Sequence, residues 1–191
     1  MGKLVVITAP SGAGKTTIAR HLLHQFPELY FSVSATTRAP RPHEQHGRDY
    51  FFISEKEFRE KIAAGDFLEW EEVYPGVLYG SLRSEARSGW QQGKTILFDI
   101  DVRGARRLKE QFGDHALTVF VRPPSWQALE QRLLQRGTET IQQQQLRLER
   151  ARNELQYEPF FDRVLVNDAL PVALQQATDW VSDFLRPHHQ P

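Results

Sequence analysis

The sequence predicts an α/β fold in which helices cover both faces of a parallel β-sheet. Two observations carry this prediction. Short apolar runs with the pattern of buried strands recur along the 191 residues, and amphipathic helical segments follow them. Strands that alternate with helices are joined by crossover connections, which leave neighbouring strands parallel. The length suits one domain, and an apolar content of 40% can supply a sizeable core.

The first strand and helix flank a glycine-rich turn. Residues 4–7, LVVI, form a continuous apolar run, as expected for a strand that is buried on both faces. After the turn, Ile18, Leu22 and Phe26 recur at helical spacing. Pro27 then ends the predicted helix, because proline lacks the backbone N–H that a helix interior needs.

Two further units repeat this order. Residues 95–98 form an apolar run, and a helical stretch follows it through Leu108. Residues 117–121 form the next run, and a helix is predicted after it from about residue 126 to residue 136. Ser125 is a candidate N-cap for that helix, because its hydroxyl can accept a hydrogen bond from a free backbone N–H.

The last unit combines a strand at residues 164–166 with a C-terminal helix. Pro171 lies in the first turn of that helix, where a missing N–H costs nothing. The apolar positions on one helix face are Ala173, Ala177, Trp180, Val181 and Phe184.

Two segments interrupt the alternation of strands and helices. Residues 33–82 are rich in arginine, aromatic residues and glutamate, with one short helix that starts at a capping box of Ser54 and Glu57. Residues 125–155 are helical and rich in arginine and glutamine. We interpret the two segments as lobes inserted into one domain, residues 1–191. The core of that domain would consist of residues 1–32, 83–124 and 156–191.

Composition excludes several classes of function. Lys plus Arg and Asp plus Glu each number 24, and this balance argues against a nucleic-acid or membrane-surface partner. The absence of cysteine excludes disulfides and thiolate metal sites, and the histidines show no ligand spacing, so no structural metal is predicted. No stretch approaches the roughly 18 apolar residues of a membrane span. We therefore expect a cytoplasmic monomer or homodimer.

The glycine-rich turn resembles a phosphate-binding loop. Residues 9–17, APSGAGKTT, match G-x-x-x-x-G-K-[ST] except that Ala9 replaces the first glycine. Ala9 ends a strand and can keep a negative φ. Lys15 would supply a charge for phosphate, and the Thr16 hydroxyl can bind Mg²⁺. The candidate nucleotide-binding residues are Ala9, Pro10, Ser11, Gly12, Ala13, Gly14, Lys15, Thr16 and Thr17. A preceding strand and a following helix favour this interpretation over a chance turn.

Longer motifs carry a family resemblance. They are SVSATTRAPRP at 32–42, GRDYFF at 47–52, FLEWEEVYPGVLYGS at 67–81, FDIDVRGA at 98–105, FVRPPS at 120–125, RLLQRGTET at 132–140 and VNDA at 166–169. In this order they resemble the guanylate kinases over nearly the whole chain. The resemblance implies a P-loop NTPase fold with an inserted mixed-β GMP-binding lobe and a helical lid. It also implies that ATP phosphorylates GMP, and dGMP, to give ADP and the diphosphate.

The resemblance assigns a grip for the acceptor phosphate to Arg38, Arg41, Tyr50 and Tyr79. Chemistry supports the assignment, because a dianion needs bidentate guanidinium groups and hydroxyl donors. Taken singly, each arginine would be interpreted as a surface residue and each tyrosine as a half-buried aromatic. Their positions inside the family motifs reverse that interpretation.

Guanine presents two neighbouring donors, N1–H and an amine, beside the O6 acceptor, and a carboxylate accepts from both donors. By resemblance this carboxylate is Glu69, with Ser34 and Ser81 on the base edge and Ser81 placed to donate to O6. Adenine would leave these polar groups unpaired, which makes discrimination strong. Glu71 and Glu72 are interpreted as solvated strand charges without a role.

Two carboxylates follow the run at residues 95–98. Asp99 and Asp101 lie at the carboxyl end of a predicted strand, where open parallel sheets bind ligands. Their spacing of two points both side chains to the same face. By resemblance, Asp101 contacts GMP. Three roles stay open for Asp99: an approach to Mg²⁺ through water, orientation of the acceptor phosphate, or a cap on the next helix.

Phosphoryl transfer depends mainly on positioning and on charge stabilisation, and an ionised acceptor phosphate needs no general base. The predicted catalytic residues are Lys15, Arg38 and two lid arginines assigned by resemblance, Arg136 and Arg147. Arg132 would join them at the ATP phosphates, and Asn167 matches a family residue near the adenine. Four other arginines are interpreted as ordinary solvated charges: Arg106, Arg107, Arg150 and Arg152.

Two alternatives come from other functional classes. A guanylate-kinase-like binding module would bind peptides without catalysis, but such modules typically lose the loop or its lysine, and both are present here. A related P-loop kinase could act on a phosphosugar, although it would have no use for Glu69 with Ser34 and Ser81. The pair Pro75–Gly76 lengthens the loop before Tyr79 relative to the commonest family form, which bears on the placement of Tyr79.

Overall fold

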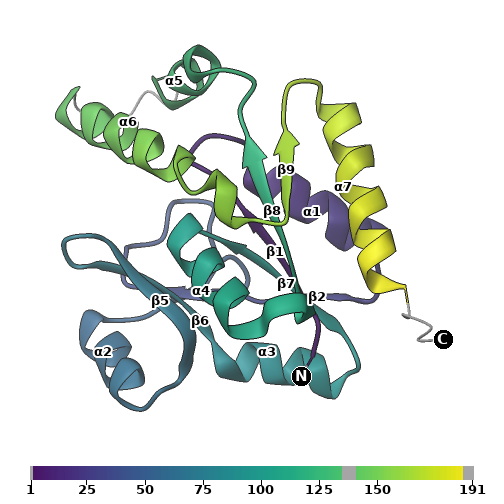
Figure 1. Ribbon diagram of the computed structural model, residues 1–191. Helices are drawn as coiled ribbons and strands as arrows, with labels where there is room; N and C mark the ends of the chain where they lie inside the picture. The colour runs from purple at the N-terminus through teal and green to yellow at the C-terminus, as the bar shows by residue number, and fades with distance from the viewer. Residues whose placement is uncertain (1, 135–140, 187–191) are drawn as a thin grey trace.

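The computed structural model describes residues 2–134 and 141–186 and contains two β-sheets (Figure 1). The larger sheet has five strands, and every neighbouring pair in it is parallel. Its strand order is β2 (Leu29–Phe31), β7 (Thr95–Ile100), β1 (Leu4–Thr8), β8 (Ala116–Arg122) and β9 (Arg163–Val166). The predicted parallel sheet is confirmed.

Helices cover both faces of the parallel sheet. Helices α1 (Lys15–Gln25) and α7 (Leu170–Leu185) pack on one face, and α3 (Arg83–Gln91) and α4 (Val102–Phe112) pack on the other. The central strand β1 serves both cores, because successive side chains of a strand point to opposite faces. All five of its residues are buried, which explains why its sequence is a continuous apolar run.

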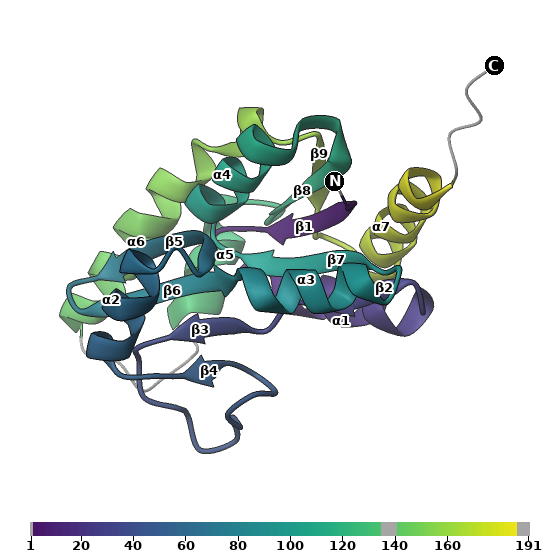
Figure 2. The same cartoon turned by 90° about the horizontal axis from the view of Figure 1, so that it is seen from below.

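A smaller mixed sheet lies beside the parallel one (Figure 2). Its strand order is β4 (Phe51–Phe52), β3 (Ser34–Thr36), β6 (Val77–Leu82) and β5 (Phe67–Tyr74). The short helix α2 (Glu55–Ala63) covers it, and Phe58 stacks on Phe67 with ring centroids 4.4 Å apart. The predicted N-cap of this helix is present, since Ser54 Oγ accepts a 3.1 Å hydrogen bond from the Glu57 N–H.

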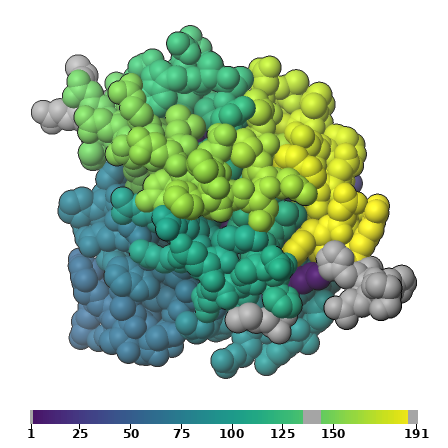
Figure 3. Space-filling view, viewed as in Figure 1, coloured from purple at the N-terminus to yellow at the C-terminus, as the bar shows by residue number. Residues whose placement is uncertain are grey.

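The second inserted segment contains α5 (Trp126–Leu134) and α6 (Ile141–Leu155). Ser125 Oγ accepts a 3.1 Å hydrogen bond from the Ala128 N–H, as its predicted role as an N-cap requires. Short 3₁₀ turns, η1 (Gly113–His115) and η2 (Glu158–Phe160), follow α4 and α6. Figure 3 shows the segment with α6 as a light green band above the blue surface of the mixed sheet.

Strand β2 and helix α3 were not predicted from the sequence. The only buried residues of α3 are Ala86 and Gly89, so this helix shows no periodic pattern of large apolar side chains. Strand β2 has only three residues. Helix α4 also extends beyond Leu108, to Phe112. In the described part of the chain, no helix is both long enough and apolar enough to cross a membrane.

Candidate active site

The phosphate loop lies between β1 and α1. Its two glycines have left-handed backbone angles, with φ of 89° at Gly12 and 97° at Gly14. Ala9 is buried and is not among the described residues with positive φ, so the position needs no glycine. A Cβ on Gly14 would overlap the Asn167 side-chain nitrogen. The loop therefore depends on glycine where the backbone turns and where Asn167 packs against it.

Asn167 links the loop to the end of β9. Its Nδ2 donates a 2.8 Å hydrogen bond to the Ala13 carbonyl, and its own carbonyl accepts one of 3.4 Å from Arg132 Nη2. Asn167, predicted near the adenine, and Arg132, predicted at the ATP phosphates, thus lie together beside the loop. Arg136 belongs to residues 135–140, which lie outside the described chain.

Lys15, Thr16 and Asp99 meet at the carboxyl end of the sheet. Lys15 Nζ and Asp99 Oδ1 form an ion pair, and the Thr16 hydroxyl donates a 2.8 Å hydrogen bond to Asp99 Oδ2. Burial alone would lower the pKa of Lys15, but the charge and hydrogen bond of Asp99 outweigh it and raise the pKa above its usual value. The lysine therefore keeps its charge at the position where the loop would bind phosphate.

Asp101 caps α4. Its Oδ1 accepts hydrogen bonds of 2.9 Å from the backbone N–H groups of Arg103 and Gly104. The helix cap considered for Asp99 is thus made by Asp101, while Asp99 faces Lys15. Both carboxylates still border the same cavity.

A cavity of about 210 Å³ joins the phosphate loop to the mixed sheet and α6. The following predicted residues line it: Ala9, Ser11, Lys15, Ser34, Arg41, Tyr50, Glu69, Tyr79, Asp99, Asp101 and Arg147. They come from segments far apart in the sequence, which the fold brings to one space. Six lining residues were not predicted for the site: Val73, Tyr74, Gly80, Ile100, Arg150 and Glu154.

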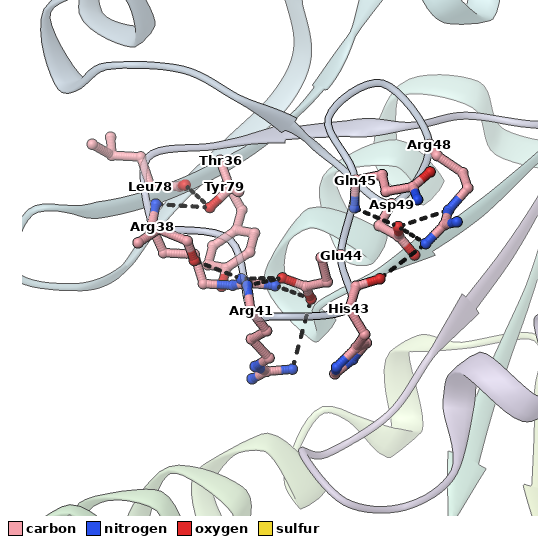
Figure 4. Close-up of polar contacts among 11 residues, drawn as sticks. Thr36, Arg38, Arg41, His43, Glu44, Gln45, Arg48, Asp49, Leu78 and Tyr79 are labelled. Atoms are coloured by element: carbon pink, nitrogen blue, oxygen red, sulfur yellow. Dashed lines mark hydrogen bonds and ion pairs between the residues drawn. The ribbon is translucent and has the colours of Figure 1, made fainter.

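Arg38 lies among several hydrogen-bond partners at one end of the site (Figure 4). Its Nε donates a 2.9 Å hydrogen bond to the Tyr79 hydroxyl, and its Nη1 and Nη2 each donate one of 2.6 Å to Glu44. Glu44 also accepts a 2.8 Å bond from the Arg41 N–H. The hydrogen bonds from Arg38 lower the pKa of Glu44 to about 2, so this carboxylate stays ionised. Sequence reasoning missed Glu44.

Glu69 and Ser81 form the other end of the site. They are paired neighbours on β5 and β6, and Ser34 lies opposite Ser81 on β3. The Ser81 hydroxyl donates a 2.6 Å hydrogen bond to Glu69 Oε1. Burial, together with the negative charge of Asp101, raises the pKa of Glu69 to about 8. In this structure the hydroxyl of Ser81 therefore binds the carboxyl group of Glu69, and Ser81 is fully buried.

The interpretation of Glu71 as a solvated charge is wrong. The residue is buried, and its carboxylate receives hydrogen bonds of 2.8 Å from Arg103 and 2.9 Å from Arg107. Both arginines belong to α4, so this cluster ties β5 to the helix beside it. Half of the Arg107 side chain is exposed, but its guanidinium group is paired with the buried carboxylate of Glu71.

Arg150 is also not an ordinary solvated charge. Its Nε donates a 2.6 Å hydrogen bond to Glu154 Oε1, and its Nη1 donates one of 3.0 Å to the Val73 carbonyl. Its guanidinium carbon lies 5.2 Å from the centroid of the Tyr74 ring, which allows a cation–π contact. Glu154 Oε2 in turn accepts a 3.1 Å bond from the Ser11 N–H of the phosphate loop.

Comparisons with known proteins agree with this geometry. A sequence model of the family described as Guanylate kinase matches residues 1–184. The chain belongs to the guanylate kinase family. A guanylate kinase from Salinibacter ruber is 51% identical over 182 residues, covering 95% of this chain and 96% of that protein. One from Thermotoga maritima is 44% identical over 180 residues, covering 94% and 86% respectively.

Solved structures lead to the same family. The crystal structure of guanylate kinase from Anaplasma phagocytophilum superposes with a TM-score of 0.78 at 28% identity, covering 97% of this chain and 87% of that one. A Thermus thermophilus structure with a TM-score of 0.54 and 14% identity shares the fold alone. The predicted family resemblance and the α/β fold with a second, mixed sheet are confirmed.

Proposed function

We propose that the protein transfers the γ-phosphate of ATP to GMP, and to dGMP, and releases ADP and the diphosphate. The observation that carries this proposal is the single cavity that Lys15 of the phosphate loop and Glu69 of the mixed sheet both line. A donor and an acceptor that meet in one cavity react as if in one molecule, since their approach and orientation are already fixed.

At the acceptor end, we assign the monophosphate to Arg38, Arg41, Tyr50 and Tyr79. Three of these residues line the cavity: Arg41, Tyr50 and Tyr79. The fourth, Arg38, donates a hydrogen bond to the Tyr79 hydroxyl. Guanidinium groups and phenol hydroxyls suit a phosphate dianion. Arg38 and Lys15 would also offset the repulsion between the two phosphate groups during transfer.

At the base end, we assign the guanine N1–H and amine to Glu69. Ser34 and Asp101 border the same space and complete the polar edge. We assign Ser81 to the positioning of Glu69, because its hydroxyl donates to that carboxyl group. A base that offers an acceptor where N1–H is required would leave Glu69 without a donor, which penalises adenine.

For the donor we assign ATP to the loop residues 9–17, with Asn167 near the adenine and Arg132 near the ATP phosphates. Arg147 borders the cavity from α6, where it can reach the phosphates. Arg136, outside the described residues, keeps its sequence-based assignment to the same group. We further propose that residues 33–82 act as the acceptor lobe and residues 125–155 as a lid within one domain.

We propose Mg²⁺ as the metal that accompanies ATP. The Thr16 hydroxyl and the Asp99 carboxylate lie 2.8 Å apart, and hard oxygen ligands of this kind fit Mg²⁺. Thr16 would bind the ion directly, and Asp99 would hold it through water. When bound, the ion neutralises charge on the donor phosphates. Among the described residues, no group of three His, Cys, Asp or Glu side chains is arranged as a metal cluster, so the phosphates would complete the coordination.

The test is a turnover assay with ATP against GMP, AMP and ribose phosphates. Selective ADP formation with GMP supports the proposal. Preference for a ribose phosphate would favour the phosphosugar kinase, and absence of turnover with every acceptor would favour the binding module. A monomeric or homodimeric state and a cytoplasmic location stay predictions, which sedimentation and cell fractionation can test.

A further inference from the structure

Gly104 of α4 lies directly against the carboxyl group of Glu69. A Cβ built on Gly104 would lie 2.8 Å from Glu69 Cδ and would overlap Oε2. Real Cβ atoms do not approach other heavy atoms this closely, so any other residue at position 104 must displace the carboxyl group. The three atoms nearest to this Cβ position all belong to Glu69.

The backbone gives no other reason for glycine at this position. Gly104 lies within α4, and it is not among the described glycines with positive φ. A glycine inside a helix costs about 1 kcal/mol relative to alanine. The glycine therefore weakens the helix at a position where a side chain would meet Glu69.

Other contacts fix Glu69 on its remaining sides. Ser81 holds Oε1 through the 2.6 Å hydrogen bond. Two residues along β5, Glu71 is bound by Arg103 and Arg107, so the strand cannot easily move away from α4. The carboxyl group thus sits between a hydroxyl on one oxygen and the bare helix backbone beside the other.

We propose that Gly104 determines acceptor specificity by leaving the space in which the Glu69 carboxyl group faces the base. The inference rests on the proposed function, in which Glu69 accepts from N1–H and from the amine of guanine. With glycine at position 104, both oxygens can lie in the plane of those two donors. With a side chain at this position, the carboxyl group turns and meets at most one of them.

The test is Gly104→Ala, assayed with GMP and with IMP, which keeps N1–H but lacks the amine. We expect the KM for GMP to rise roughly tenfold or more, because a hydrogen bond to a charged group is lost. The ratio of kcat/KM for GMP to that for IMP should fall, while kcat at saturating GMP changes much less. The melting temperature should change little, because the helix preference of alanine offsets the cost of displacing a buried, hydrogen-bonded carboxyl group.

Gln111→Ala, on the exposed side of α4, is the matched control and should change neither KM nor the ratio. The variant Glu69→Gln distinguishes a wrong assignment of Glu69 from a wrong role for Gly104. If Glu69→Gln leaves GMP kinetics unchanged, the assignment of Glu69 fails and the inference about Gly104 fails with it. If Glu69→Gln impairs GMP use but Gly104→Ala does not, only the role of Gly104 is overturned. In the double variant, Gly104→Ala should add little to the loss, since it acts through Glu69.

Discussion

Glu44 binds both terminal nitrogens of Arg38, with two hydrogen bonds of 2.6 Å. The same carboxylate accepts from the Arg41 N–H, so it orders both arginines that we assign to the acceptor phosphate. Its side chain is only 7% exposed, and its pKa of about 2 keeps it ionised. Glu44 therefore fixes the direction in which Arg38 and the turn before Arg41 face the site.

Glu44→Gln should weaken GMP binding more than transfer. Glutamine can accept only one of the two strong bonds, so Arg38 loses its fixed orientation. We expect the KM for GMP to rise roughly tenfold with a smaller change in kcat, as for the loss of a charge-assisted hydrogen bond. Glu60→Gln, an exposed carboxylate on α2, is the control. A KM that stays at the wild-type value would show that Arg38 does not depend on Glu44.

Lys15→Met should remove transfer and preserve the fold. The ammonium group is paired with Asp99, and we assign it to the charge that develops on the moving phosphoryl group. Loss of one preorganised donor typically costs about 10²–10³ in kcat. Steady-state kinetics measures the loss, and circular dichroism checks the fold. A kcat within a few-fold of the wild-type value would contradict the assignment of Lys15 to the transferred phosphoryl group.

GMP binding should strengthen as pH rises from 7 to 8.5. The pKa of Glu69 is raised to about 8, well above its usual value, so the free protein holds a proton on this carboxyl group at pH 7. Two guanine donors need the ionised form, whose population grows as pH rises through the folded pKa. The KM for GMP should fall over this range, and binding at pH 7 should release a proton that calorimetry in two buffers detects.

Glu69→Gln controls for other titrating groups, because it removes this proton and should flatten the KM profile. The phosphate of GMP is already mainly dianionic at the lower limit, since its second pKa is about 6. A wild-type KM that is constant between pH 7 and 8.5 would contradict a protonated Glu69 in the free protein.

The sequence predicted the central strands because their burial is a local property. Strands β1 and β8 are covered on both faces, so nearly all their residues are apolar. This pattern can be recognised within the five and seven residues of the strands themselves. Helix α3 lacked such a signal, since its buried residues are Ala86 and Gly89, which do not distinguish a buried face from a turn.

The burial of charged residues was not predictable in this way. Glu71 and Arg150 have the same local pattern as solvated charges, but each also has a partner 32 or more positions away along the chain. Gly104 matters only because the fold places Glu69 of β5 against α4, and this contact is not visible in the local sequence. Position-specific chemistry came from the family motifs, which gave the residues near the cavity but not the contacts among them.

Arg150 and Glu154 connect three parts of the molecule. Both lie on α6, one helical turn apart, and form a largely buried pair. Through this pair, α6 contacts the phosphate loop at Ser11 and the tip of β5 at Val73. The donor loop and the acceptor sheet thus share one structural support, which lies at the border of their common cavity.

Glu154→Gln should therefore weaken the use of both substrates. The substitution keeps the shape but leaves the Arg150 charge uncompensated and the Ser11 N–H with a weaker acceptor. We expect a loss of about 2 kcal/mol in unfolding free energy and a rise in KM for both ATP and GMP. Glu149→Gln, an exposed position on the same helix, should change neither. Chemical denaturation and initial-rate kinetics measure the effects. A rise in KM for one substrate alone would mean that the pair supports only that side of the cavity.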